Sequence, residues 1–274
     1  NMGGTAHEIG VKQEAYFIWD RFGSSHKVKF VTIPFERIVG QILERTHHGV
    51  RGVILKRMMM RVGSQVARKL NAEALVTGES VGQVSSQTLT NLNHIDRVSD
   101  CLVLRPLVME DKQDIVDKAW EIGTAGFAES IPEYCGVISD HPNVCPERSF
   151  VEEEEAKMDA NLVEEAVEAA AVLDIKAIPE NTSKLEIEVE TVKELAKDDV
   201  ILDVRSPDDA AKAPLKDETH QVIELPFYKV ASEFGNLDKL KTYALFCDQG
   251  VMSTMQAHEL KEKGHHNVKV YRPD

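Results

Sequence analysis

The chain has 274 residues with a formal net charge of −14, and 42% of its residues are hydrophobic and 28% charged. This composition excludes a disordered or collagen-like chain, and the length suits one large or two modest domains. No run approaches the roughly 18 apolar residues of a membrane helix, and the amino end lacks the apolar block of a secretory signal, so we expect a cytoplasmic protein with no membrane partner.

The first 120 residues alternate helical and strand-like patterns. Helices are predicted at 6–21, 35–45, 52–70, 83–92 and 111–123, and strands at 28–33, 72–78 and 101–107. Such alternation predicts a mostly parallel α/β sheet with helices on both faces. Ligands of such sheets bind at the carboxyl ends of strands, which here are the turns after Val76 and Leu104.

The composition changes at Glu152, where Glu and Ala become dominant. Residues 150–200 contain 16 acidic and five basic side chains, so most of the negative charge lies in this middle segment. Apolar residues at helical spacing predict one amphipathic helix from Glu152 to Ala171, followed by a linker that contains Pro179 and Asn181. The near-neutral flanking segments leave a nucleic-acid partner neither excluded nor supported by charge.

The final segment predicts a second, smaller α/β domain. Strands are predicted at 200–207, 243–250 and 268–271, and a helix at 252–264 that ends at Gly264.

Four cysteines at irregular spacing, Cys101, Cys135, Cys145 and Cys247, argue against a disulfide scaffold. Cys247 joins a predicted strand to a predicted helix, where loop N–H groups and the helix dipole favour a thiolate. Phosphoester hydrolysis in such a loop needs an Arg six residues after the cysteine, whereas this chain has Ser253. Sulfur transfer through a persulfide is therefore favoured. A buried cysteine that only packs is the alternative.

Longer blocks carry a resemblance to known families. The segments LDVRSP, LPFYKV and CDQGVMSTMQAHELKEKGHHNVKVYRP resemble a rhodanese domain. The segments GGTAHEIGVKQ, GVILKRMMMRVGSQVA, ALVTGESVGQVSSQTLTNL, LRPLVMEDKQDI and IPEYCGVIS resemble the tRNA 4-thiouridine synthetase (tRNA sulfurtransferase) family that carries a carboxy-terminal rhodanese domain. The blocks follow in the same order over nearly the whole chain.

The resemblance implies an α/β domain organisation. Residues 1–150 correspond to the carboxy-terminal part of a PP-loop ATP-binding, adenylating domain with a parallel sheet, residues 151–194 to an acidic helical linker, and residues 195–274 to the rhodanese domain. The SGGxDS motif and the ferredoxin-like and THUMP modules of the family are absent from the sequence. We expect a fragment or a chain read from Met2.

The family's reaction is implied as well. A cysteine desulfurase loads a persulfide, ATP (with Mg²⁺ expected) adenylates the uridine at tRNA position eight, and the persulfide sulfur displaces AMP. A second implied output is sulfur for the carrier protein of thiamine thiazole synthesis. No prosthetic group is expected. Adenylation makes a leaving group of the uridine oxygen, and the persulfide supplies a strong nucleophile.

The family's site residues map onto six positions. Cys247 matches the persulfide cysteine, Cys135 in PEYCG the resolving cysteine that forms a disulfide with it, Lys112 a residue for adenylation, and Lys56, Gly78 and Gln87 the ATP-binding residues. The chain departs from the family at Thr254, where many relatives place an Arg directly after the loop serine.

Two other functions remain open. One is a stand-alone persulfide carrier or thiosulfate sulfurtransferase that uses only Cys247, and the other is a non-catalytic binding module with a degenerate nucleotide domain. Cys135, His141 and Cys145 provide too few ligands for a metal site, so we expect no metal.

Overall fold

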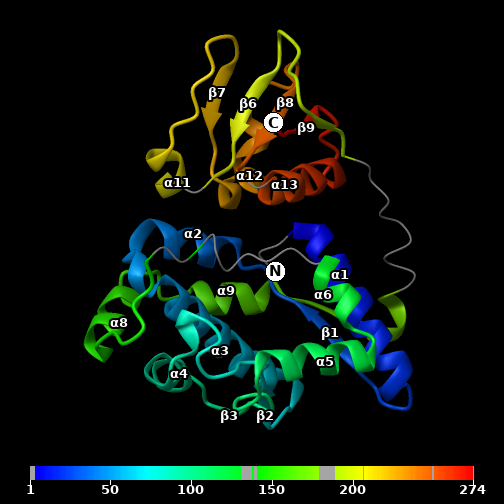
Figure 1. Cartoon of the computed structure of the whole chain (residues 1–274), viewed down its shortest axis with the longest axis vertical. Coiled ribbons are helices and arrows are strands. Elements are labelled where there is room, and N and C mark those ends of the chain that lie inside the picture. The colour runs from blue at the N-terminus through cyan, green and yellow to red at the C-terminus, as the bar shows by residue number, and fades with distance from the viewer. Residues whose placement is uncertain are drawn as a thin grey trace. The chain divides into compact units, whose positions relative to one another are not determined.

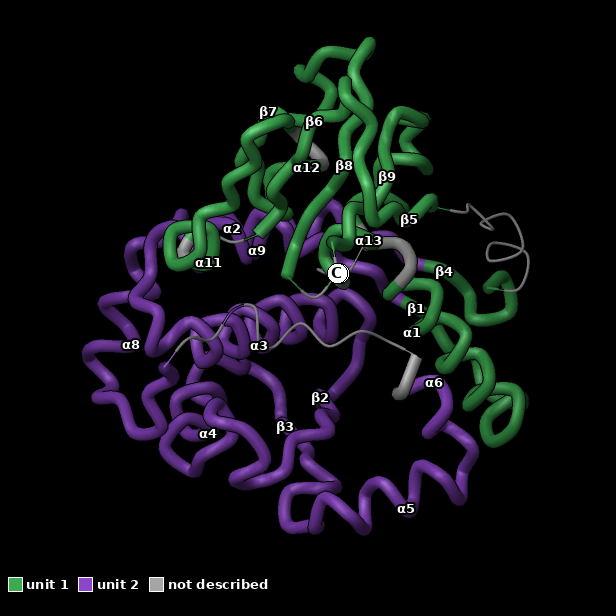
Figure 2. The backbone as a smooth tube through the Cα atoms, turned by 45° about the horizontal axis from the view of Figure 1, so that its top comes forward, with its two compact units in different colours: residues 1–30, 173–274 green, residues 31–172 purple. Residues whose placement is uncertain are grey.

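The computed structural model describes residues 4–130, 138, 141–178, 189–205, 207–248 and 250–273. The chain forms two compact units, one of residues 31–172 and one of residues 1–30 with 173–274 (Figure 2). These units are groupings in space, and the domain boundaries near 150 and 194 stay a prediction. No helix in the described part of the chain is both long and apolar enough to cross a membrane.

The unit of residues 31–172 is mainly helical. Its helical segments are α2 (Glu36–Arg45), η2 (His48–Val50), α3 (Arg51–Leu70), η3 (Ser85–Gln87), α4 (Leu89–Asp96), α5 (Lys112–Ile122), α6 (Ala125–Ser130), α8 (Arg148–Glu155) and α9 (Leu162–Glu168). Strands β2 (Ala74–Val76) and β3 (Leu102–Leu104) form a parallel pair. Strands β1 (Lys29–Thr32) and β4 (Ala171–Asp174), which span the two ends of this residue range, form a second two-stranded sheet.

Helix α3 is the centre of this unit. It contacts α2, α4, α8 and α9 (Figure 1), and its apolar side chains, among them Val53, Ile54 and Met58, are buried. The helix ends where Asn71 adopts a left-handed backbone with φ 55°, which satisfies the last carbonyls of the helix. Burial of one face along 20 residues makes α3 the scaffold on which the remaining elements pack.

The unit of residues 1–30 and 173–274 contains a five-stranded sheet in the order β5-β9-β8-β6-β7, parallel throughout. Its strands are β5 (Thr191–Val192), β6 (Val200–Asp203), β7 (Gln221–Glu224), β8 (Tyr243–Phe246) and β9 (Val268–Tyr271). Its helical segments are α1 (Gly4–Ile18), η1 (Trp19–Gly23), η4 (Ile175–Ala177), α11 (Pro207–Lys212), α12 (Phe227–Glu233), η5 (Phe234–Asn236) and α13 (Val251–Glu262). Strands β6 and β8 are buried along their whole length, as expected of apolar runs inside a parallel sheet.

The α/β fold class expected from the sequence is confirmed, and β1, β2, β3, β6, β8 and β9 lie within the predicted strands. Of the strands described in the first 120 residues, β2 and β3 pair in parallel with each other over three residues, whereas β1 pairs with β4. The side chains of Val76 on β2 and Leu102 on β3 are exposed.

Two predicted helices are wrong in their extent. The single helix expected from Glu152 to Ala171 is divided into α8 and α9, because the Asp159 backbone N–H donates to Gln41 Oε1 over 2.8 Å and its carboxylate binds Arg45, which turns the chain onto α2. The helix expected from Gln83 begins only at Leu89, where the Thr88 hydroxyl accepts a hydrogen bond from the Asn91 N–H over 3.2 Å and caps α4.

A buried ion pair joins α8 to α3. The Arg57 guanidinium, 3% exposed, hydrogen-bonds Glu155 through Nε and the His94 carbonyl through Nη1 over 2.6 Å. Replacing Glu155 by Gln leaves this buried cation without a counter-charge.

We expect Glu155→Gln to lower the free energy of unfolding by about 1–3 kcal/mol, measured by urea denaturation followed by circular dichroism. The matched control is Glu152→Gln on the same helix, whose partner Arg148 is exposed, and it should leave the unfolding curve unchanged. Equal effects of the two substitutions would contradict this account.

Candidate functional site

Cys247 is the first residue after strand β8, at the carboxyl edge of the five-stranded sheet. The chain then turns into α13, and Gly250 precedes that helix with a positive φ of 74°. The turn is closed by the Gly250 N–H, which donates to the Cys247 carbonyl over 3.2 Å. A left-handed residue at this point favours glycine, and the turn directs the cysteine toward the first turn of α13.

The sulfur of Cys247 is buried, with 7% of the residue exposed, and it contacts Ser253. The Ser253 backbone N–H donates to Sγ over 3.3 Å, and the Ser253 hydroxyl oxygen lies 3.5 Å from Sγ. The hydroxyl itself donates to the Gly250 carbonyl over 3.1 Å. A backbone donor from the first turn of a helix stabilises negative charge on the sulfur, so the loop suits a thiolate or a persulfide anion.

A buried ion-pair network supports this loop from strand β6. The Arg205 guanidinium binds both carboxylate oxygens of Asp203, with Nη2 to Oδ2 at 2.6 Å, and its Nη1 lies 3.2 Å from Asp248 Oδ1. The guanidinium carbon also lies 5.2 Å from the centre of the Phe246 ring. Hydrogen bonds to Asp203 hold the pKa of Arg205 above its ordinary value. Arg205 thereby ties the end of β6 to the residue that follows Cys247.

Lys56, Gly78 and Gln87 gather in the other unit, at the carboxyl end of β2. Lys56 projects from α3 and its Nζ lies 3.5 Å from Glu79 Oε1. The Gln87 Oε1 accepts a hydrogen bond from the Ser80 N–H over 3.3 Å. No heavy atom lies within 4 Å of the position a Cβ would take on Gly78, so this turn is open to a ligand. The structure therefore brings the three predicted nucleotide residues into one neighbourhood.

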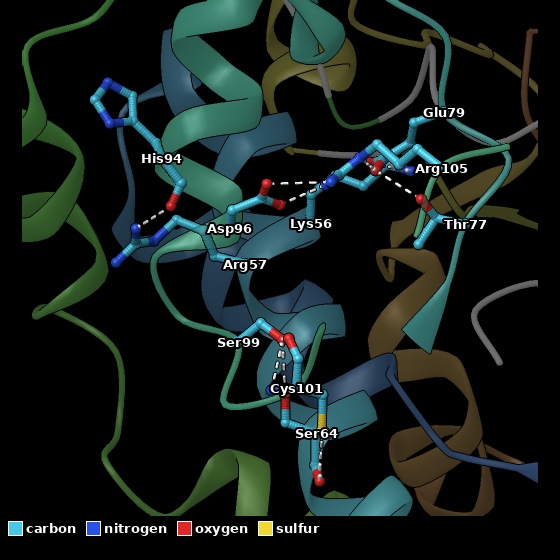
Figure 3. A network of polar contacts seen from close by, with 10 residues as sticks. All are labelled: Lys56, Arg57, Ser64, Thr77, Glu79, His94, Asp96, Ser99, Cys101 and Arg105. Atoms are coloured by element: carbon cyan, nitrogen blue, oxygen red, sulfur yellow. Dashed lines mark hydrogen bonds and ion pairs between the residues drawn. The ribbon is translucent and has the colours of Figure 1, made fainter. Parts of the chain in front are cut away.

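Glu79 is the residue of this neighbourhood that the sequence did not single out. Its carboxylate, 3% exposed, is held between Lys56 and the Arg105 Nε at 2.8 Å, and it accepts from the Thr77 hydroxyl over 3.0 Å (Figure 3). Arg105 in turn binds Asp96 on α4 through two nitrogens. Burial on its own raises the pKa of Glu79, but the charge of Lys56 and the hydrogen bonds from Arg105 and Thr77 outweigh it and hold the pKa below its ordinary value. Only its place directly after Gly78 in LVTGES could have drawn attention to it.

Lys112 is the exposed first residue of α5. Asp111 caps this helix by accepting from the Gln113 N–H over 2.8 Å. The preceding turn is bound to the residues after Gly78, since the Ser80 hydroxyl donates to the Glu110 carbonyl over 3.0 Å. Lys112 therefore begins its helix two residues after a direct contact with the Gly78 turn.

The structure describes two further cysteines, Cys101 and Cys145. Cys135 lies outside the described residues. Cys101 is half-buried, with its sulfur 4.0 Å from the Ser64 carbonyl, and Cys145 is exposed. Among the residues that the structure describes, no three His, Cys, Asp or Glu side chains are grouped as metal ligands.

Comparison with known proteins assigns both parts of the chain. Residues 1–160 match the family described as "Thiamine biosynthesis protein (ThiI)", and residues 188–273 match the rhodanese-like domain. The chain is 56% identical over 272 residues to a tRNA sulfurtransferase of Tolumonas auensis and 54% identical over 273 residues to one of Yersinia pestis. The matches include 99% and 100% of this chain but 56% of each relative. The chain therefore spans about half the length of these curated relatives.

A solved structure is similar as well. It is a 4-thiouridine synthetase in complex with RNA and with bound ATP, 28% identical, with a TM-score of 0.56 over 62% of this chain and 45% of that one.

The ion pairs of Glu79 predict an acid-sensitive contribution to stability. We expect Glu79→Gln to lower the free energy of unfolding at pH 7 by about 1–3 kcal/mol, because Lys56 and Arg105 lose their shared counter-charge. Since the pKa of Glu79 is lowered by folding, its contribution is complete above the ordinary glutamate pKa of about 4.3 and is lost as the pH falls through the lower folded value.

Urea denaturation between pH 7 and pH 3 measures this difference. The gap between wild type and Glu79→Gln should shrink in acid. A gap that stays constant over this range would mean that packing, and not charge, is what Glu79 contributes.

Proposed function

Because this chain belongs to the ThiI family and continues into a rhodanese-like domain, we propose that it is the catalytic part of a tRNA sulfurtransferase that makes 4-thiouridine at tRNA position eight. The observation that carries the proposal is the Cys247 sulfur under the Ser253 N–H, at the carboxyl edge of the rhodanese-type sheet. Rhodanese-like domains and tRNA sulfurtransferases share sulfur transfer, and this loop is built to hold an anionic sulfur.

In the first step the Cys247 thiolate attacks the terminal sulfur of a cysteine desulfurase persulfide. A sulfur–sulfur bond forms on Cys247, the desulfurase thiolate leaves, and the number of electrons is conserved. The Ser253 N–H, 3.3 Å from Sγ, stays directed at the sulfur that carries the new bond.

In the second step the terminal sulfur of the persulfide attacks C4 of the uridine. ATP supplies the leaving group by converting the uridine O4 into an adenylate, and AMP departs. The Cys135 thiolate then attacks Sγ of Cys247, which releases thiolated uridine and leaves a Cys135–Cys247 disulfide. A dithiol reductant returns two electrons and restores both thiols.

Lys56, Gly78 and Gln87 support the proposed use of ATP. Lys56 provides a cation for phosphate, the open Gly78 turn permits close approach of a ligand to the backbone, and Gln87 can hydrogen-bond a base or ribose. Lys112 at the start of α5 is proposed to stabilise charge during adenylation, with Mg²⁺ accompanying the nucleotide. The ATP-bound structural relative favours this assignment.

The remaining assignments follow from the same proposal. The domain division is 1–150, 151–194 and 195–274, the partners are tRNA, a cysteine desulfurase and the sulfur carrier of thiamine synthesis, and the reaction takes place in the cytoplasm, where tRNA is modified.

The second candidate is a persulfide carrier or thiosulfate sulfurtransferase that works without ATP. It is favoured by one observation: among the described residues, the hydrogen-bond contacts to the Cys247 sulfur come from Ser253, which lies in the same unit of residues 1–30 and 173–274.

Mass spectrometry of the chain after incubation with a cysteine desulfurase and cysteine tests the proposal. We expect an adduct of about 32 Da, one sulfur atom, on Cys247, and a Cys135–Cys247 disulfide after the reductant is removed. Cys247→Ser should lose both, Cys135→Ser should keep the adduct and lose the disulfide, and the control Cys101→Ser should keep both.

The outcomes separate the candidates. An adduct that never resolves into the disulfide would favour the carrier, and a folded chain with no adduct would leave a binding module.

A further inference from the structure

The ion pairs around the Cys247 loop do not balance in charge. Two carboxylates, Asp203 and Asp248, share the single guanidinium of Arg205. The group therefore carries one net negative charge directly beside Cys247. An anionic sulfur adds a second negative charge, which the ion pairs of Arg205 do not offset.

Arg272 is the cation that meets this loop from another strand. It follows β9, and its backbone N–H donates to the Val192 carbonyl over 2.9 Å, which fixes its position at the sheet. Its side chain lies on Gly250: Nε is 2.7 Å and the guanidinium carbon 3.1 Å from the position a Cβ would take there. Any side chain at Gly250 would displace this guanidinium.

No ion pair within the described part of the chain neutralises the charge of Arg272. The residue is exposed, and no acidic side chain of the described residues forms an ion pair with it. Arg205, in contrast, is buried and is shared by two carboxylates.

Thr254 brings no charge to the loop. Its hydroxyl donates to the Gly250 carbonyl over 2.7 Å, a contact within the first turn of α13.

We propose that Arg272 is a positioning residue that supplies positive charge to the loop that holds the Cys247 sulfur. The inference rests on the proposed function in one respect, that Cys247 works as an anionic sulfur. The Gly250 N–H donates to the Cys247 carbonyl and the Ser253 N–H donates to Sγ, so the guanidinium on Gly250 lies against the same turn that holds the sulfur.

Alkylation of Cys247 by iodoacetamide tests the inference, with the Cys247 peptide quantified by mass spectrometry so that the other cysteines do not interfere. We expect Arg272→Gln to slow alkylation at pH 7 by about three- to tenfold, because the loop loses a positive charge that stabilises an anionic sulfur in the reaction. Arg272→Lys, which keeps the charge, should remain within about twofold of wild type.

Two further variants separate charge from structure. Lys263→Gln removes one positive charge from the opposite end of α13, where the lysine pairs with Glu259, and should leave the rate unchanged. Thr254→Arg combined with Arg272→Gln returns a cation to the loop and should restore most of the rate.

Three results would overturn the inference: an unchanged alkylation rate in Arg272→Gln, an equal loss in Lys263→Gln, or a double variant no faster than Arg272→Gln. Each would assign Arg272 to packing alone. Failure of the proposed function is a separate result, since wild-type Cys247 would then gain no sulfur from the desulfurase even if Arg272 controls its alkylation.

Discussion

The parallel pairing of β6 with β8 determines the chemistry of the rhodanese-like domain. Its register places Asp203 opposite Phe246, so the residues that follow the two strands, Arg205 and Asp248, meet as an ion pair at the carboxyl edge. A slip of one residue in this pairing would turn the side chains after β6 and β8 to opposite faces and break the contact between Arg205 and Asp248. The position of the Cys247 loop therefore depends on main-chain hydrogen bonds between two buried apolar strands.

The nucleotide residues depend on a similar arrangement around α3. Lys56 stands on this helix, while Glu79 follows β2 and Arg105 follows β3, and the parallel pairing of these strands brings the last two together. In both units a buried carboxylate just after or at the end of a strand is bound by arginine, Glu79 by Arg105 and Asp203 by Arg205. Each carboxylate is acceptable inside the protein because its hydrogen bonds and ion pairs replace water.

The sequence predicted what local patterns specify. Apolar runs followed by turns predicted β2, β6 and β8, and the turn after β8 identified Cys247 without any tertiary information. Interactions between segments that are distant in the sequence could not be predicted from these patterns. The contact of Asp159 with Gln41 that divides the acidic helix joins residues 118 positions apart, and the ion pair of Glu79 with Arg105 joins residues 26 apart. Periodicity cannot report such contacts because each segment keeps its helical or strand pattern whether or not the partner is present.

The roles of Arg205 and Arg272 at the Cys247 loop differ because their guanidinium groups differ in their ion pairs within the described part of the chain. Arg205 is fixed in place by two carboxylates and by the Phe246 ring, so it gives the loop shape and contributes little uncompensated charge. Arg272 is held through its backbone and its side chain lies on Gly250, and no acidic side chain in the described part of the chain forms an ion pair with it. A loop that must accept an anionic sulfur and later release it needs both properties, a rigid support and a nearby cation that is not already paired. Supplying them from different strands allows the residue after Ser253 to be Thr254, whose hydroxyl only completes the first turn of α13.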